Sequence, residues 1–281
     1  MKVASGFAHV EADAVTKVFG SRKADRLVAV DRVTLAVEAG RRVGIVGESG
    51  SGKSTLARML VGLDAPTSGT ILFDGNGLPT LSRADMTGFR RAVQFVAQDT
   101  SSSFDPRRTL RDAVRTPAQR LLGLDRRAAD ARVEETFELL GLPLELADRI
   151  PGDVSGGQRQ RVALARALVV QPRILVCDEV VSALDVSVQG SILNLLKRYC
   201  AEHDAGLVFV SHGLPATAFI AEELVVMRHG TIVEQGTTAQ VLHEPGHDYT
   251  RLLLRAHSGR PDADEAAEII EGDLVPAGAD A

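Results

Sequence analysis

The most informative stretch of the sequence reads, in order, Gly47, Glu48, Ser49, Gly50, Ser51, Gly52, Lys53, Ser54 and Thr55. It follows the apolar run 43–46 and leads into 56–61, which has helical spacing. A glycine-rich loop between a strand and a helix is typical of phosphate binding, because glycines let successive backbone N–H groups turn toward one anion. In that setting Lys53 reaches the β- and γ-phosphates and the Ser54 hydroxyl binds Mg²⁺. We therefore predict a nucleoside triphosphate site, in preference to an accidental glycine-rich turn.

The bulk composition is that of an ordinary globular protein, and it limits the kinds of partner. The chain has 281 residues, 44% hydrophobic and 25% charged, which is enough for one large domain or two small ones. The formal net charge of -5 argues against nucleic acid as a bulk electrostatic partner. Cys177 and Cys200 lie far apart in the sequence, so we interpret them as buried thiols.

No segment of the sequence has the features of a membrane anchor. Residues 1–6 lack the apolar core of a signal peptide. No run reaches the roughly 18 uncharged apolar residues that a membrane-spanning helix needs. We therefore expect any association with a membrane to depend on a partner.

The N-terminal part and the segment after the glycine-rich loop read as strands. Residues 10–19 and 28–37 form one predicted pair, and 70–73 and 93–97 are further strands. Phe19 ends the first strand. A phenylalanine in that place most often packs in a core or at an edge, and its functional alternative is a flat surface for a nucleobase.

From residue 109 to about 154 the pattern changes from strands to helices. Apolar residues recur at helical intervals among arginine and acidic residues, which predicts a helical insertion carried by an α/β body. Its end is marked by a turn directly before a predicted helix at 159–170, and the turn consists of Ser155, Gly156, Gly157 and Gln158. Such a helix start can bind an anion, and a plain capped helix start explains the same residues.

Polar residues stand at the ends of the predicted buried strands. Asp178 and Glu179 close the strand 174–179, and His212 follows the strand 206–210. Paired acids are usually a solvated strand end, and a lone histidine is usually structural. Strands that alternate with helices imply a mostly parallel sheet, however, and the carboxyl ends of its strands meet at one edge. We therefore expect one site made of Lys53, Ser54, Gln98, Asp178, Glu179 and His212.

The C-terminal part contains a predicted hairpin at 225–233 and a closing helix at 247–256. The tail 257–281 is rich in acidic residues and has little periodicity, so we predict that it is disordered and assign it no role. The predicted domain therefore covers residues 8–256.

The order of these motifs resembles the ATP-binding subunit of an ABC transporter. The resemblance spans about residues 8–256 and rests on GESGSGKST at 47–55, Gln98, VSGGQ at 154–158, ILVCDE at 174–179, SALD at 182–185 and His212. It implies an α/β fold, a P-loop NTPase (RecA-like) core with a mostly parallel sheet. It also implies an N-terminal antiparallel β subdomain, a helical insertion subdomain at about 109–170 and a C-terminal extension at about 236–256. The implied activity is ATP hydrolysis with Mg²⁺.

The resemblance also implies a role for each motif. Residues 47–55 would be the Walker A loop, Asp178 the Walker B acid and Glu179 the catalytic base. Gln98 would sense Mg²⁺ and the attacking water, and His212 would lie at the γ-phosphate. Mg²⁺ would thus be held by Ser54, Gln98 and Asp178.

Three further roles concern the rest of the nucleotide and the contact between subunits. Phe19 would stack on adenine, which reverses the interpretation of that residue as core. The signature residues Ser155, Gly156, Gly157 and Gln158 would close over ATP bound to a second ATPase subunit, and Asp185 would lie at the contact between the two. One chain would then supply two half-sites.

Several residues depart from the family pattern. Val154 replaces the usual leucine of the signature, and Gly213 replaces the usual aspartate after the switch histidine. Val180 and Val181 replace the usual proline and threonine. All the polar groups assigned to chemistry are present, so we expect both half-sites to be competent.

The loop 98–107 and the C-terminal extension resemble the peptide/nickel importer ATPases, although Asp248 stands where proline is usual. This resemblance implies import of di- or oligopeptides, with nickel, a metallophore or another small solute as the alternative. The implied partners are two transmembrane permease subunits, an extracytoplasmic solute-binding protein and a second ATPase subunit. The implied location is the cytoplasmic face of the plasma (inner) membrane, as a peripheral protein. Less favoured alternatives are a soluble ABC ATPase of translation or DNA repair and a P-loop kinase, which leaves the signature unexplained.

Overall fold

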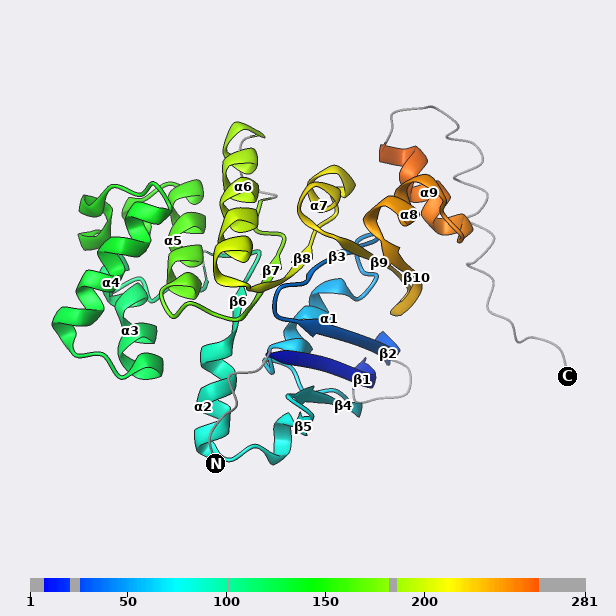
Figure 1. Cartoon of the computed structure of the whole chain (residues 1–281), viewed down its shortest axis with the longest axis horizontal. Helices are drawn as coiled ribbons and strands as arrows, with labels where there is room; N and C mark the ends of the chain where they lie inside the picture. Colours follow the sequence, from blue (N-terminus) through cyan, green and yellow to red (C-terminus); the bar gives the residue numbers. More distant parts are fainter. Residues whose placement is uncertain (1–7, 21–25, 101, 182–185, 258–281) are drawn as a thin grey trace, which may run out of the picture.

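The computed structural model describes residues 8–20, 26–100, 102–181 and 186–257 (Figure 1). Among these residues the larger sheet has the strand order β10-β9-β3-β8-β7-β6. Neighbouring strands from β9 to β6 run parallel, and β10 is antiparallel to β9. Every residue of β7 and β8 is buried, as expected for parallel strands covered on both faces. The strands are β3 (Arg42–Val46), β6 (Val93–Val96), β7 (Ile174–Asp178), β8 (Gly206–Val210), β9 (Glu223–Arg228) and β10 (Thr231–Thr237).

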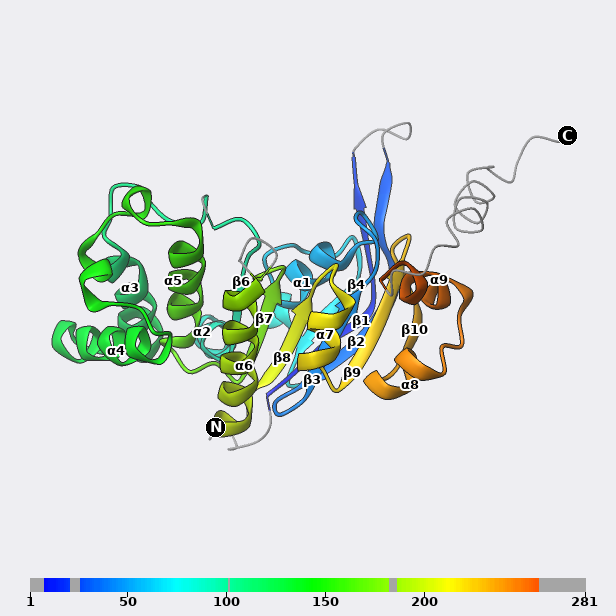
Figure 2. The same cartoon turned by 90° about the horizontal axis from the view of Figure 1, so that it is seen from above.

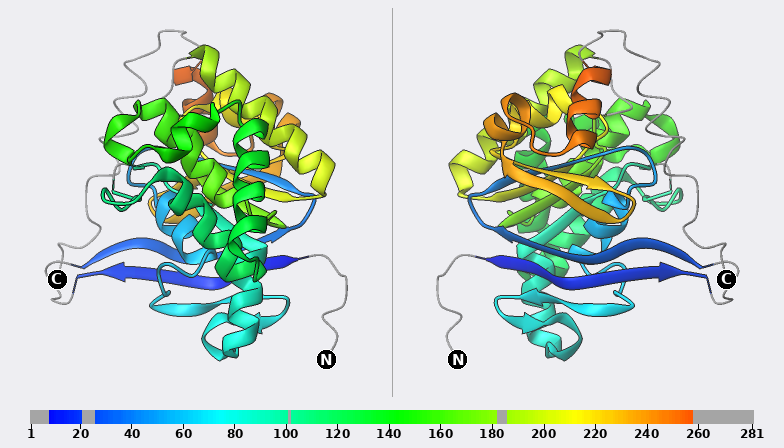
Figure 3. Two further views of the ribbon diagram at one scale, coloured as in Figure 1. Left: turned by 90° about the vertical axis from the view of Figure 1, so that its left-hand side faces the viewer. Right: turned by 90° about the vertical axis from the view of Figure 1, so that its right-hand side faces the viewer.

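The second sheet is antiparallel and is formed by strands from the N-terminal part of the chain, drawn in blue and cyan in Figure 3. Its order is β2-β1-β4-β5, with β1 (His9–Phe19), β2 (Leu27–Glu38), β4 (Ser68–Phe73) and β5 (Asn76–Gly77). The helix α1 (Lys53–Leu60) lies between the two sheets, because its residues Leu56, Met59 and Leu60 share one apolar cluster with strands of both. This packing fixes the helix that follows the glycine-rich loop.

Helices cover one end of the larger sheet and the face that is turned away from α1 and the second sheet (Figures 1 and 2). The helical subdomain consists of α3 (Leu110–Leu122), α4 (Arg126–Leu139) and α5 (Gly156–Leu168), with the short 3₁₀ turns η3 (Leu144–Asp148) and η4 (Pro151–Asp153). Its apolar cluster is continuous with residues of α6 (Val186–His203) and of β7 and β8. The remaining elements are η2 (Leu78–Thr80), α2 (Arg83–Ala92), α7 (Leu214–Ile220), α8 (Thr238–His243) and α9 (Asp248–His257).

The predicted fold class is confirmed, and the differences are local. The helix after the signature begins at Gly156 rather than Arg159, because Ser155 caps it. The sequence patterns did not predict α2, α7 and α8. The helix α2 buries Phe89 and is otherwise mostly polar, while α7 and α8 are short, so each gives a weak periodic signal. The exact limits of the predicted domain stay a prediction, and residues 258–281 lie outside the described part.

The side chain of Phe137 in α4 is 1% exposed and belongs to the apolar cluster of the helical subdomain. We expect Phe137→Ala to lower the free energy of unfolding by about 3–5 kcal/mol, because it removes buried contacts and leaves a cavity. Leu139 of the same helix is 39% exposed, so Leu139→Ala is the matched control and should change stability by less than about 1 kcal/mol. Urea unfolding of the full chain checks both, and equal losses would contradict this assignment of the core.

Candidate active site

The backbone of the glycine-rich loop lies so close to two strands that no side chain fits at Gly47 or Gly52. Gly47 has φ +148°, and a Cβ there would lie 2.2 Å from the Met227 carbonyl oxygen. Gly52 has φ +100°, and a Cβ there would lie 2.2 Å from the Ala29 carbonyl oxygen. Both values of φ lie in the region that favours glycine. The loop therefore has its shape because β2 and β9 enclose its backbone.

Lys53 lies under the loop and is 3% exposed. Its Nζ donates to the Gly47 carbonyl oxygen at 2.8 Å and to the Glu48 carbonyl oxygen at 2.6 Å. Burial lowers the pKa of Lys53, and the nearby carboxylates, led by that of Glu179, act in the opposite direction. A poorly hydrated ammonium group at this place favours a bound anion.

Ser54 and Asp178 bring two side-chain oxygen atoms together beside Lys53. The Ser54 hydroxyl donates to Asp178 Oδ1 at 2.9 Å, although the two residues come from α1 and β7. Burial raises the pKa of Asp178; the Ser54 hydrogen bond lowers it, and the charge of Glu179 raises it further. Mg²⁺ prefers hydroxyl, carboxylate and phosphate oxygens, so this donor set fits the ion.

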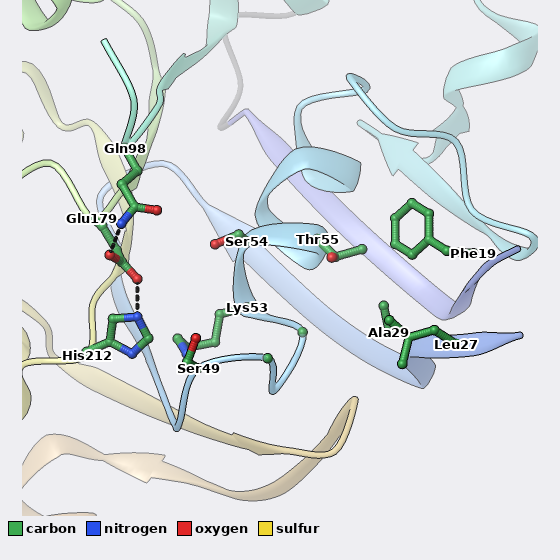
Figure 4. Close-up of a pocket in the computed structure, with 12 residues that line it drawn as sticks. Phe19, Leu27, Ala29, Ser49, Lys53, Ser54, Thr55, Gln98, Glu179 and His212 are labelled. Carbon is green, nitrogen blue, oxygen red and sulfur yellow. Dashed lines mark hydrogen bonds and ion pairs between the residues drawn. The ribbon is translucent and has the colours of Figure 1, made fainter. Parts of the chain in front are cut away.

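Glu179 follows β7 and is 6% exposed. Gln98 Nε2 donates to Glu179 Oε2 at 2.5 Å, and His212 Nε2 lies 2.5 Å from Oε1 (Figure 4). Glu179 has φ +50°, which is uncommon for a residue with a side chain, and its N–H donates to the Val210 carbonyl oxygen at 2.9 Å. The carboxylate is thus contacted by two side chains, which come from the ends of β6 and β8 on either side of its own strand.

One cleft of about 300 Å³ runs from this carboxylate to the aromatic ring of Phe19 (Figure 4). Phe19 is 42% exposed, so this side chain does not pack in a core. The sequence patterns did not indicate Leu27, which pairs with Phe19 across the β1–β2 hairpin and lines the same end of the cleft. The hairpin register was the signal that would have found it. The cleft is lined by Phe19, Leu27, Ala29, Ser49, Gly50, Gly52, Lys53, Ser54, Thr55, Gln98, Glu179 and His212.

Three residues of the loop do not line this cleft. Gly47 is enclosed by β9, and Ser51 is buried with its carbonyl oxygen accepting from the Gly230 N–H at 3.0 Å. The backbone N–H of Glu48 donates to the hydroxyl of Tyr249 at 2.9 Å. Tyr249 is a contact of the loop that the sequence analysis did not assign, and only the resemblance of the C-terminal extension drew attention to it.

The signature residues lie apart from the cleft. Ser155 and Gly156 are exposed at the start of α5, and none of the residues 155–158 lines the cleft. The Ser155 hydroxyl accepts from the Gln158 N–H at 3.2 Å, and Gln158 Oε1 accepts from the Ser155 N–H at 2.9 Å. The turn is thus a capped helix start whose surface faces outward. Asp185 lies outside the described residues.

The residues that depart from the family pattern have ordinary structural places. Val154, Val180 and Val181 are buried in the apolar cluster of the helical subdomain. Gly213 precedes α7, and its N–H donates to the Ser211 hydroxyl at 3.0 Å. None of the four lines the cleft.

Known proteins resemble this chain in sequence and in fold. Residues 30–182 match the family model described as ABC transporter. The chain is 38% identical to the oligopeptide transport ATP-binding protein OppF of Lactococcus lactis subsp. lactis (strain IL1403), over 85% of this chain and 75% of that protein. It is 39% identical to the nickel import ATP-binding protein NikE of Brucella suis biovar 1 (strain 1330), over 88% and 94%.

A solved structure with a similar fold is the dimeric post-hydrolysis state of the ATP-binding cassette MJ0796 bound to ADP and Pi. The TM-score is 0.74 at 29% sequence identity, over 82% of this chain and 98% of that chain. Among the described residues, no helix of this chain is both long and apolar enough to cross a membrane. The fold, the family match and these relatives together show that this chain is an ATP-hydrolysing member of the ABC transporter family.

Proposed function

We propose that this chain is the subunit that binds and hydrolyses ATP to energise an importer of di- or oligopeptides. The observation that carries the hydrolytic part is the Glu179 carboxylate, which Gln98 and His212 contact in the cleft that Lys53 also lines. The peptide part is supported by OppF, whose name is that of an oligopeptide transport protein.

Each polar group of the cleft has a task in this proposal. The N–H groups of the loop and the ammonium of Lys53 bind the phosphates, and Phe19 stacks on adenine. Glu179 takes a proton from the water that attacks the γ-phosphorus, while the bond from that phosphorus to ADP breaks. Gln98 and His212 hold the Glu179 carboxylate so that it faces the water. Ser54, Asp178 and Gln98 would hold Mg²⁺, which would neutralise charge on the phosphates.

Two copies of such a surface are needed for a complete site. The signature turn is exposed and outside the cleft of its own chain, so we infer that it covers ATP bound to a second ATPase subunit, with Asp185 at the contact. MJ0796, the structural relative, is described as a dimer. ATP is then part of the interface, and its hydrolysis favours the open state because the contacts to the γ-phosphate are lost.

The importer would place this chain on the cytoplasmic face of the inner membrane. Its partners would be two permease subunits and an extracytoplasmic solute-binding protein, and the ATPase domain would cover residues 8–256. Nickel or another small solute is the alternative, which the relative NikE favours because this chain covers 94% of that protein. A solute screen on the reconstituted complex separates the two. We expect peptides to stimulate ATP hydrolysis, and stimulation by nickel alone would contradict peptide import.

We expect Glu179→Gln to keep ATP binding and to lower the rate of hydrolysis by about 10²–10⁴-fold, because the general base is lost. The variant should accumulate as an ATP-loaded dimer, which size-exclusion chromatography with light scattering detects. Glu202 is exposed on α6, so Glu202→Gln is the matched control and should behave as wild type. Undiminished hydrolysis by Glu179→Gln would remove Glu179 from the role of general base.

Lys53→Ala should instead weaken ATP binding itself, because the cation that faces the phosphates is removed. Lys197→Ala, at an exposed lysine, is its control.

Asp178→Asn should raise the stability of the nucleotide-free chain at pH 7 while weakening the binding of Mg²⁺-ATP. The folded-state pKa of Asp178 lies above its ordinary value of 3.8, chiefly because of burial. The stabilising contribution of this group is therefore fully present below that ordinary value and is lost as the pH rises through the folded-state pKa. At pH 7 the ionised, buried carboxylate costs stability, and the amide removes that cost.

Urea midpoints measured between pH 4 and pH 7 check this prediction, and the gain should shrink toward the acidic end. Asp148→Asn is the control of opposite sign, because the hydrogen bond from Arg111 lowers the pKa of that exposed carboxyl. A lower midpoint for Asp178→Asn than for wild type at pH 7 would contradict the prediction.

A further inference from the structure

The C-terminal segment contacts the phosphate-binding loop through the side chain of Tyr249. This residue lies in the first turn of α9, and its hydroxyl accepts a hydrogen bond from the Glu48 N–H at 2.9 Å. The two residues are 201 positions apart in the sequence. The contact therefore joins the last described helix to the second residue of the loop.

The peptide unit that Tyr249 contacts also holds Lys53. The N–H of Glu48 and the carbonyl of Gly47 belong to the same planar peptide group, and they point in opposite directions. The N–H donates to Tyr249, while the carbonyl oxygen accepts from Lys53 Nζ at 2.8 Å. A rotation of this peptide would break both bonds. The tyrosine hydroxyl thus fixes the orientation of the group on which the lysine ammonium rests.

The ring of Tyr249 is itself held firmly. It is 2% exposed and belongs to an apolar cluster with Val46, the last residue of β3 before the loop. The guanidinium of Arg228 lies over the ring at 4.9 Å from its centroid. The hydroxyl therefore has a defined position from which to accept the hydrogen bond.

The segment that leads into α9 is tied to the larger sheet. The carboxylate of Glu234 in β10 accepts from the N–H groups of Gly246 at 2.7 Å and His247 at 3.1 Å. The N–H of Tyr249 donates to His247 Nδ1 at 3.1 Å. These bonds place the start of α9 beside β10, which pairs with β9, one of the two strands that enclose the loop. The position of α9 and the shape of the loop are therefore mechanically connected.

We propose that Tyr249 is a positioning residue for nucleotide binding, which couples the docking of α9 to the conformation of the phosphate-binding loop. This inference rests on the proposed role of residues 47–55 in binding the triphosphate. Tyr249 acts through the Gly47–Glu48 peptide and does not line the cleft. Because coupling between two sites is reciprocal, bound nucleotide also stabilises the docked position of α9.

The chain has two tyrosines, Tyr199 and Tyr249, which provides a matched pair of variants. Tyr199 is also 2% exposed, and its hydroxyl contacts the Pro172 carbonyl oxygen at 3.3 Å, away from the loop. Tyr199→Phe and Tyr249→Phe each remove one buried hydroxyl and keep the ring. We expect Tyr249→Phe to bind Mg²⁺-ATP about three- to tenfold more weakly, the range that a single hydrogen bond allows. Tyr199→Phe should bind as wild type does.

Calorimetric titration of the full chain with Mg²⁺-ATP measures these affinities, and urea unfolding without nucleotide verifies that both variants are folded. A spectroscopic measurement gives a second test that needs no change at Tyr249. In Tyr199→Phe with ring-labelled tyrosine, the remaining NMR signal comes from Tyr249, and we expect Mg²⁺-ATP to shift it.

The outcomes separate this inference from the proposed function. If wild type does not bind Mg²⁺-ATP, both are overturned. If wild type binds but Tyr249→Phe binds with equal affinity, the inference is overturned and the proposed function stands. Selective weakening in Tyr249→Phe supports the inference, because a tyrosine kept only for packing would not affect affinity more than Tyr199 does.

Discussion

The backbone of the phosphate-binding loop has little freedom, and the arrangement of the molecule follows from that constraint. Strand β2 approaches Gly52 and strand β9 approaches Gly47 so closely that a Cβ would collide with their carbonyl oxygens. The two strands belong to different sheets. The helix α1 packs between these sheets, so the loop that precedes it cannot move without disturbing both layers. A rigid set of N–H groups binds an anion with little loss of conformational entropy.

The parallel sheet then brings the other chemical groups to this loop. Asp178 ends β7, Glu179 follows it, and His212 lies just beyond β8, which pairs with both β7 and β3. Gln98 follows β6, the edge strand beside β7. The four groups come from three strand ends, those of β6, β7 and β8, so the site depends on the register of these strands. Burial of the charged forms of ionisable groups here costs folding free energy, as the raised pKa of Asp178 and the lowered pKa of Lys53 indicate.

The parts of the site that sequence could predict are those with local patterns. The glycine-rich loop, the strand ends at Asp178 and His212, and the turn at Ser155 each have a characteristic order of residue types. The mostly parallel sheet followed from the alternation of strands and helices, and the rest of the fold class was implied by the family resemblance. The chemical roles of these site residues rest on the family resemblance and remain proposals. The same holds for Asp185, which lies outside the described residues.

Other features depend on contacts between distant residues, which no local pattern indicates. The exposure of Phe19 follows from the hairpin that pairs it with Leu27. The contact of Tyr249 with the loop follows from the packing of α9 against β3 and β9. The positive φ of Glu179 is likewise set by its surroundings, because a side chain in that conformation needs support from the fold.

In the proposed function, the separation between the cleft and the signature turn makes the chain incomplete by itself. The central claim is that the loop 47–55 binds the triphosphate in the cleft and that residues 155–158 of a second subunit close over it. A structure of the full chain with Mg²⁺ and a non-hydrolysable ATP analogue tests this most directly. Our account predicts the triphosphate on the loop N–H groups between Lys53 and Glu179. A triphosphate bound elsewhere, or covered by the signature turn of the same chain, would contradict it.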